Sequence, residues 1–95
     1  GSETYNKIFM TAVQLFPDNP VANLNAACIS LMQRDVKSAG HYLEKAPEVP
    51  ETALAKGVLY LLKNQYEEAE SFFRQAKAAG LSQADDNLKR ILELK

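Results

Sequence analysis

This 95-residue sequence contains one cysteine and one histidine. Both residue types can act in catalysis or bind a metal ion. Cys28 is a candidate nucleophile, but no His, Lys or Arg lies at a neighbouring helical step to lower the pKa of its thiol. We therefore expect Cys28 to be a buried, small apolar residue. His41 has no second metal-ligating or catalytic partner nearby in the sequence, and we expect it at the surface.

A cluster of carboxylates is the third candidate for chemistry. Glu67, Glu68 and Glu70 lie close together, with Arg74 one helical turn beyond Glu70. Consecutive glutamates on a helix point in different directions, so the cluster predicts a solvated face. The ion pair within that helix would contribute about 0.3 kcal/mol.

The sequence contains no glycine-rich phosphate loop, no cysteine and histidine spacing typical of metal sites, and no nucleophile with a positioned base. We therefore predict a protein that is not an enzyme, with no catalytic residues, no metal site and no cofactor.

The charge balance is nearly neutral. The net charge is −1 and 24% of the residues are charged, with both signs interspersed. The chain therefore has no positive electrostatic potential strong enough to bind nucleic acid or an anionic bilayer. The longest apolar run extends only from Val58 to Leu62, whereas a membrane span needs about 20 residues. We predict no nucleic-acid partner and no membrane insertion.

The chain length is that of a single domain, since about 100 to 200 residues is typical of one. We expect residues 1–2 to be a cloning remnant and residues 3–95 to form the domain, as a fragment of a longer protein.

Apolar residues at three- and four-residue steps predict an all-α protein of about six helices. The predicted helices cover residues 4–16, 20–33, 36–46, 50–63, 66–79 and 82–95. Asn19 and Asp35 are suited to cap the second and third helices, and Pro20 and Pro50 to occupy first turns. One apolar stripe runs along the first helix, made of Tyr5, Ile8, Phe9, Ala12, Val13 and Phe16.

Three further residues predict a helix contact and two helix ends. Gly57 in the middle of the fourth helix costs about 1 kcal/mol against alanine, which indicates a backbone contact that tolerates no side chain, where another helix crosses. Asn64 suits a left-handed turn after that helix, and Gly80 ends the fifth. The aromatic residues of the later helices have the spacing of core contacts; they are Tyr60, Tyr66, Phe72 and Phe73.

The sequence repeats itself. Residues 35–46 align with residues 65–76 when shifted by thirty positions, which pairs Ala39 with Ala69 and Ala46 with Ala76. Repeats of paired helices stack into scaffolds that act by binding.

The repeat resembles the tetratricopeptide repeat family. The best-matching unit has Gly57 and Tyr60 in its first helix, followed by the second-helix residues Tyr66, Ala69, Phe73 and Ala76. An earlier unit matches at Ala27, Ala39, Leu43 and Ala46, and the first helix supplies a closing half-unit with Phe9, Ala12 and Pro17. The resemblance implies a right-handed superhelix of antiparallel helix hairpins, divided into a half-repeat at 3–19, repeats at 20–49 and 50–81, and a capping helix at 82–95.

The chain also departs from that family. Ala12 and Ala46 are 34 residues apart but Ala46 and Ala76 only 30, so about one helical turn is absent near Pro47 to Pro50. Asn23 and Ala53 occupy the position of the family's first-helix tryptophan. The ending around Gly80 resembles the Sel1-type repeat, and the whole is similar to C-terminal repeat segments of bacterial envelope proteins, which favours the periplasm over the cytoplasm.

The resemblance implies an apolar groove lined by the first helix of each unit. The expected groove residues are Leu24, Asn25, Cys28, Met32, Leu54, Val58 and Leu62. Only Asn25 fits the pattern with which the family grips a C-terminal carboxylate, so a carboxylate clamp is not expected.

Two functions follow from this surface. In the first, the groove receives a protein or peptide segment, and the chain is a non-catalytic interaction scaffold. In the second, the chain is a structural spacer or self-association module whose apolar surface packs on its own parent chain or a second copy. The sequence leaves both open.

Overall fold

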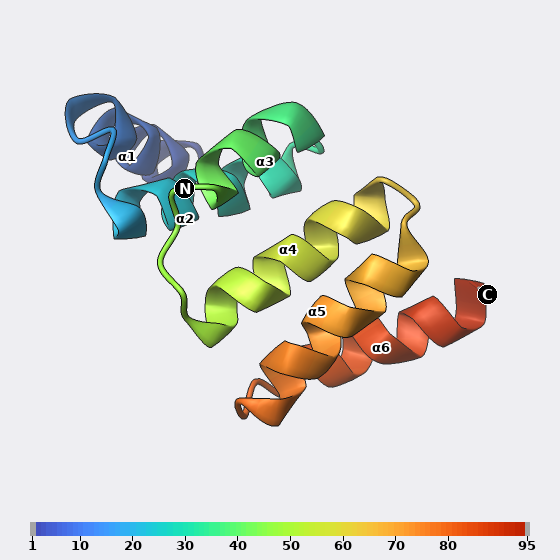
Figure 1. Ribbon diagram of the computed structural model, residues 1–95. Coiled ribbons are helices and arrows are strands. Elements are labelled where there is room, and N and C mark those ends of the chain that lie inside the picture. Colours follow the sequence, from blue (N-terminus) through green and yellow to red (C-terminus); the bar gives the residue numbers. More distant parts are fainter. Residues whose placement is uncertain (1, 95) are drawn as a thin grey trace. The chain divides into compact units, whose positions relative to one another are not determined.

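The computed structural model describes residues 2–94, and over that range the protein is all-α, as predicted, with no strand (Figure 1). Its helices are α1 (Ser2–Leu15), α2 (Pro20–Met32), α3 (Val36–Leu43), α4 (Pro50–Leu62), α5 (Tyr66–Ala78) and α6 (Gln83–Leu94). Gly1, half of the expected cloning remnant, lies outside the described residues.

The chain forms two compact units, residues 1–47 and 48–95. In the first, α2 packs against α1 and α3; in the second, α5 packs against α4 and α6. The boundary falls at the segment from Pro47 to Pro50, where the sequence lacks one helical turn relative to the earlier spacing. The prediction of one domain over residues 3–95 stays a prediction.

Helix α3 ends at Leu43, before the predicted Ala46. Pro47 disfavours helical geometry at Ala46 and has no amide hydrogen to extend the ladder. The last amides instead form tighter bonds, from Lys45 to the carbonyl of Tyr42 at 3.1 Å and from Ala46 to that of Leu43 at 3.3 Å.

The side-chain caps predicted at Asn19 and Asp35 are confirmed. Asn19 Oδ1 accepts a hydrogen bond from the amide of Ala22 at 2.9 Å, and Asp35 Oδ1 accepts one from the amide of Ser38 at 3.1 Å. Hydrogen bonding from Ser38 lowers the pKa of the Asp35 carboxyl. Two amides that helix geometry leaves without a carbonyl partner are thereby satisfied.

Helices α2, α4 and α5 end in the same left-handed turn. The turn residues are Arg34 (φ 59°), Asn64 (φ 60°) and Gly80 (φ 99°). In each case the next amide donates to a carbonyl five residues back, from Asp35 to Ser30 at 2.8 Å, Gln65 to Tyr60 at 2.9 Å and Leu81 to Ala76 at 3.0 Å. This is the Schellman motif, and it recurs thirty residues apart at Arg34 and Asn64. The sequence indicated the left-handed turn at Asn64 and the end of a helix at Gly80, but not the turn at Arg34.

Arg34 is the least suited of the three residues to its conformation, because a side chain with a Cβ pays about 1–2 kcal/mol in the left-handed region. We expect Arg34→Gly to raise the free energy of unfolding by up to about 1 kcal/mol, measured by urea denaturation. Arg34→Ala is the control, since it removes the charge but keeps the Cβ. An equal gain in the alanine variant would contradict the assigned cause.

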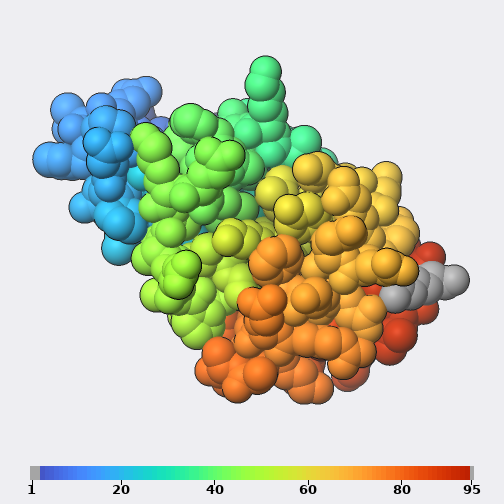
Figure 2. All heavy atoms as spheres, in the orientation of Figure 1, coloured from blue at the N-terminus to red at the C-terminus, as the bar shows by residue number. Residues whose placement is uncertain are grey.

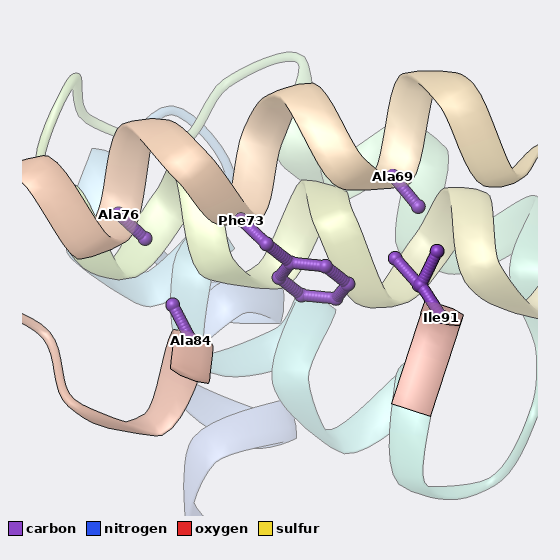
Figure 3. Close-up of a cluster of buried hydrophobic side chains, with 5 residues drawn as sticks. All are labelled: Ala69, Phe73, Ala76, Ala84 and Ile91. Carbon is purple, nitrogen blue, oxygen red and sulfur yellow. The ribbon is translucent and has the colours of Figure 1, made fainter. Parts of the chain in front are cut away.

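The core of the second unit lies between α5 and α6 (Figure 3). Phe73 is fully buried there, and its ring is flanked by small side chains from both helices. The cluster consists of Ala69, Phe73, Ala76, Ala84 and Ile91. The small residues let the helices approach closely enough to enclose one large ring.

Gly57 of α4 faces that same ring. A Cβ added at Gly57 would lie 2.5 Å from Cε1 and 2.6 Å from Cδ1 of Phe73. The prediction that another helix packs at Gly57 is therefore confirmed, but the predicted backbone contact is wrong. The crossing group is an aromatic side chain of α5 rather than backbone.

The first unit buries Val13 of α1 against Ala22 and Ala26 of α2, with Met10 and Tyr42 packed at the edge. The fully enclosed polar residue Asn23 lies beside this cluster, 2% exposed. Its amide nitrogen donates to the carbonyl of Pro17 at 3.0 Å and to that of Asn19 at 2.8 Å. Asn23 thus secures the loop between α1 and α2.

We expect Asn23→Ala to lower the free energy of unfolding by about 1–3 kcal/mol, because the carbonyl of Pro17 loses its donor and a buried space opens. Chemical denaturation of the variant measures this loss. Asn25→Ala, on a half-buried position of the same helix, is the matched control and should change stability by less. Equal losses in the two variants would contradict the role assigned to Asn23.

Candidate functional site

The predicted groove residues of α2 lie along one side of that helix. Met32 is 68% exposed, Cys28 is exposed, and Leu24 and Asn25 are half-buried. Val21, one turn earlier and 60% exposed, extends the row, although it was not among the predicted groove residues. These five residues, called here the α2 face, carry no charge. The opposite side of the helix is filled by buried residues.

One prediction about the α2 face, the burial of Cys28, is wrong. Cys28 was predicted to be buried, but it is exposed, because Ala26, Ala27 and Ile29 take the positions that face the interior. Surrounding protein atoms still desolvate the thiol and raise its pKa above the ordinary value. Cys28 therefore lacks the lowered pKa of a reactive nucleophile, as the sequence indicated.

The predicted groove residues of α4 are half-buried. Leu54 and Val58 pack against the core cluster of the second unit, so part of their apolar surface is already used for folding. Leu62 is half-buried one turn further along the same helix. The structure thus groups the predicted residues into one set on α2 and one on α4, in different units. Their combination into a single groove stays a prediction.

Aromatic and basic side chains form a second feature on α4 and α5. The rings of Tyr60 and Phe72 stack with centroids 5.5 Å apart and an interplanar angle of 7°. Lys63 Nζ lies 5.3 Å from the centroid of Tyr60, and Lys56 Nζ lies 5.8 Å from that of Phe72. Each cation faces an electron-rich ring.

The core assignment of the aromatic residues was correct in part. Phe73 is fully buried, whereas Tyr60, Tyr66 and Phe72 are half-buried. The half-buried rings pack against the core cluster or on each other and stabilise the pairing of α4 with α5.

The carboxylate cluster is a solvated helix surface with an internal ion pair. Arg74 Nη2 lies 2.6 Å from Glu70 Oε1, as predicted, while Glu67 and Glu68 are exposed. His41 is exposed, also as predicted. A shallow depression of about 540 Å³ on this part of the protein is lined by α5 residues alone; they are Glu67, Glu70, Ser71, Arg74 and Gln75.

Between residues 2 and 94, no group of three or more His, Cys, Asp or Glu side chains is placed to hold a metal ion. In the same range, every helix is too short or too polar to cross a bilayer.

The structure defines an all-α protein in which each helix packs on its neighbours in sequence within two compact units. Comparison of the chain with protein-family models, curated proteins and solved structures gives no match. The resemblance to tetratricopeptide repeats therefore rests on the residues themselves.

Proposed function

We propose that this chain is a non-catalytic protein-interaction module of the tetratricopeptide-repeat type, and that it binds an apolar partner segment on the α2 face. The observation that carries the proposal is the row of uncharged, accessible side chains from Val21 to Met32. An exposed apolar row on a helix is a common binding surface for a second helix or an extended peptide.

The chemistry of the α2 face indicates the kind of partner. Met32 is flexible and polarizable, so it can adapt to apolar side chains of different shape. Asn25 offers one polar group in an otherwise apolar row, which would orient a backbone or side-chain amide of the partner. A partner with apolar residues at three- and four-residue steps fits this surface, and a charged segment does not.

Two features of the fold support the assignment to repeats. The same Schellman turn recurs at Arg34 and Asn64, thirty residues apart. The aligned small residues Ala39 and Ala69 are both fully buried. Equivalent local geometry at equivalent alignment positions is what a repeated structural unit requires.

The proposal is tested by selecting peptides from a random library on the immobilised chain and titrating the enriched peptides by fluorescence anisotropy. Met32→Glu is expected to weaken their binding by about tenfold or more, because it places a charge against apolar partner atoms. Leu92→Glu, which changes an equally exposed apolar residue on α6, is the control and should leave the affinity unchanged.

Circular dichroism is used to check that each variant is folded. Binding that survives both Met32→Glu and Val21→Glu in folded protein would overturn the assignment to the α2 face. A library that yields no binder above the background of the bare support would argue against an interaction module altogether.

A further inference from the structure

The outer side of α1 carries apolar side chains that no other part of the described chain covers. Their exposed fractions are 65% for Tyr5, 56% for Ile8, 37% for Phe9, 68% for Leu15 and 62% for Phe16. Figure 2 shows the end of α1 and the loop that follows it, in lighter blue, at the surface. The sequence indicated an apolar stripe here, but α1 turns Val13 and Met10 toward α2 and leaves most of the stripe outside.

The exposed residues follow the spacing of a coiled-coil seam rather than a scattered pattern. Tyr5, Ile8, Ala12 and Leu15 occupy alternate three- and four-residue steps over two heptads, the a and d positions. Phe9 and Phe16 widen the seam on one side at the e positions. These six residues are called the α1 seam below. Such spacing fits a second helix lying nearly parallel or antiparallel to α1.

We propose that the α1 seam is the interface of a homodimer, in which α1 of one copy packs antiparallel against α1 of a second copy. The interface is self-complementary in shape. A two-fold axis at the level of position 10 sets the large Ile8 against the small Ala12 of the partner subunit. The same axis sets Tyr5 against Leu15 of the partner subunit.

The charge pattern favours a second copy over a charged partner. Lys7 is the single charged residue between Tyr5 and Phe16, and it does not belong to the seam. The seam therefore offers no counter-charge for an acidic or basic helix, while two neutral copies meet without repulsion. Thr4 and Thr11 border the seam and supply a polar, uncharged rim.

The area is sufficient for a weak, specific dimer. From the exposed fractions, the seam offers roughly 500 Å² of apolar surface per copy. Two copies would then bury roughly 1,000 Å², about the size at which specific interfaces begin. A dissociation constant of roughly micromolar size is expected.

Sedimentation equilibrium of the full chain between about 1 µM and about 500 µM tests the proposal. The expected result is a reversible rise in mass from monomer to dimer. Ile8→Glu should weaken the dimer by about a hundredfold or more, because the two-fold axis buries two carboxylates. Leu92→Glu and Met32→Glu, at equally exposed apolar sites outside α1, should leave it unchanged.

Cross-linking tests the orientation without altering the seam. In a Cys28→Ser background, Thr11→Cys places two thiols next to the two-fold axis, and a short bifunctional maleimide should join them. Thr4→Cys places them about 20 Å apart in the antiparallel pair but side by side in a parallel pair. We expect a covalent dimer from Thr11→Cys and none from Thr4→Cys.

Three results would overturn the proposal. A chain that remains monomeric over the whole concentration range excludes a dimer of this strength. A dimer abolished by Met32→Glu or Leu92→Glu but not by Ile8→Glu lies on another surface. Efficient cross-linking of Thr4→Cys would show a parallel pair and exclude the proposed antiparallel one.

Discussion

Phe73→Ala is expected to lower the free energy of unfolding by about 3–5 kcal/mol, the largest effect of any single substitution proposed for this chain. The ring is fully buried between α4, α5 and α6, and its neighbours Ala69, Ala76 and Ala84 are too small to refill the space. The loss therefore combines apolar transfer with a cavity that cannot collapse. Urea denaturation followed by circular dichroism measures it.

The adjacent residue Phe72 is the matched control for Phe73. Its ring is half-buried, stacks on Tyr60 and faces the ammonium of Lys56. Phe72→Ala should therefore cost less, about 1–2 kcal/mol, from partial burial and one aromatic pair. A larger loss for Phe72→Ala than for Phe73→Ala would show that Phe73 is not the centre of this core.

Gly57→Ala is expected to destabilise the protein by up to about 2 kcal/mol, although alanine favours helices over glycine by about 1 kcal/mol. The added methyl group would lie 2.5–2.9 Å from ring atoms of Phe73, so either the ring or α4 must move. Overpacking of this kind costs about 1–3 kcal/mol and outweighs the gain in helix propensity. The midpoint and slope of urea denaturation give the free energy.

A double-mutant cycle separates the clash from other effects of the alanine. Phe73→Leu removes Cε1 and Cζ, two of the three ring atoms nearest Gly57, and leaves a smaller, more flexible side chain, so Gly57→Ala should be less harmful in that background. An unchanged penalty in the Phe73→Leu protein would mean that the cost of alanine does not come from contact with Phe73. A gain in stability from Gly57→Ala alone would contradict the packing.

The sequence predicted most helices to within a residue or two of their observed ends because the signals are local. Asn19 and Asp35 cap helices through amides only three residues away, and Pro50 begins α4 with its fixed backbone angle. The helix that was predicted too long, α3, ends early because the effect of Pro47 reaches back through the preceding turn.

The conformation of Arg34 could not be predicted from its residue type alone. Its residue type argues against a left-handed conformation, yet the turn there matches the one at Asn64. The hydrogen bond from Asp35 to the carbonyl of Ser30 and the burial of the flanking helices outweigh the cost. Alignment of the two repeats at thirty residues was the signal that could have identified it.

The candidate binding surfaces were predicted less well than the helices, because exposure depends on which neighbours a helix acquires. The spacing of apolar residues predicted the stripe on α1 and the row on α2. It did not predict which of these residues a neighbouring helix would bury. In the structure Val13 turns inward while Ile8 and Phe16 remain outside, and Cys28 is exposed where burial was expected.

By itself, then, the sequence determined the all-α class, the helix starts, the left-handed turn at Asn64, the end of α5 at Gly80 and the close approach of another helix at Gly57. Each of these depends on residues within a few positions along the chain or on one missing Cβ. Only the tertiary structure decided that Phe73 fills the space at Gly57, that Asn23 secures a loop from inside, and that the α1 seam faces outward. These features arise from contacts between helices, and such contacts are set by how side-chain volumes fit together rather than by their order in the chain.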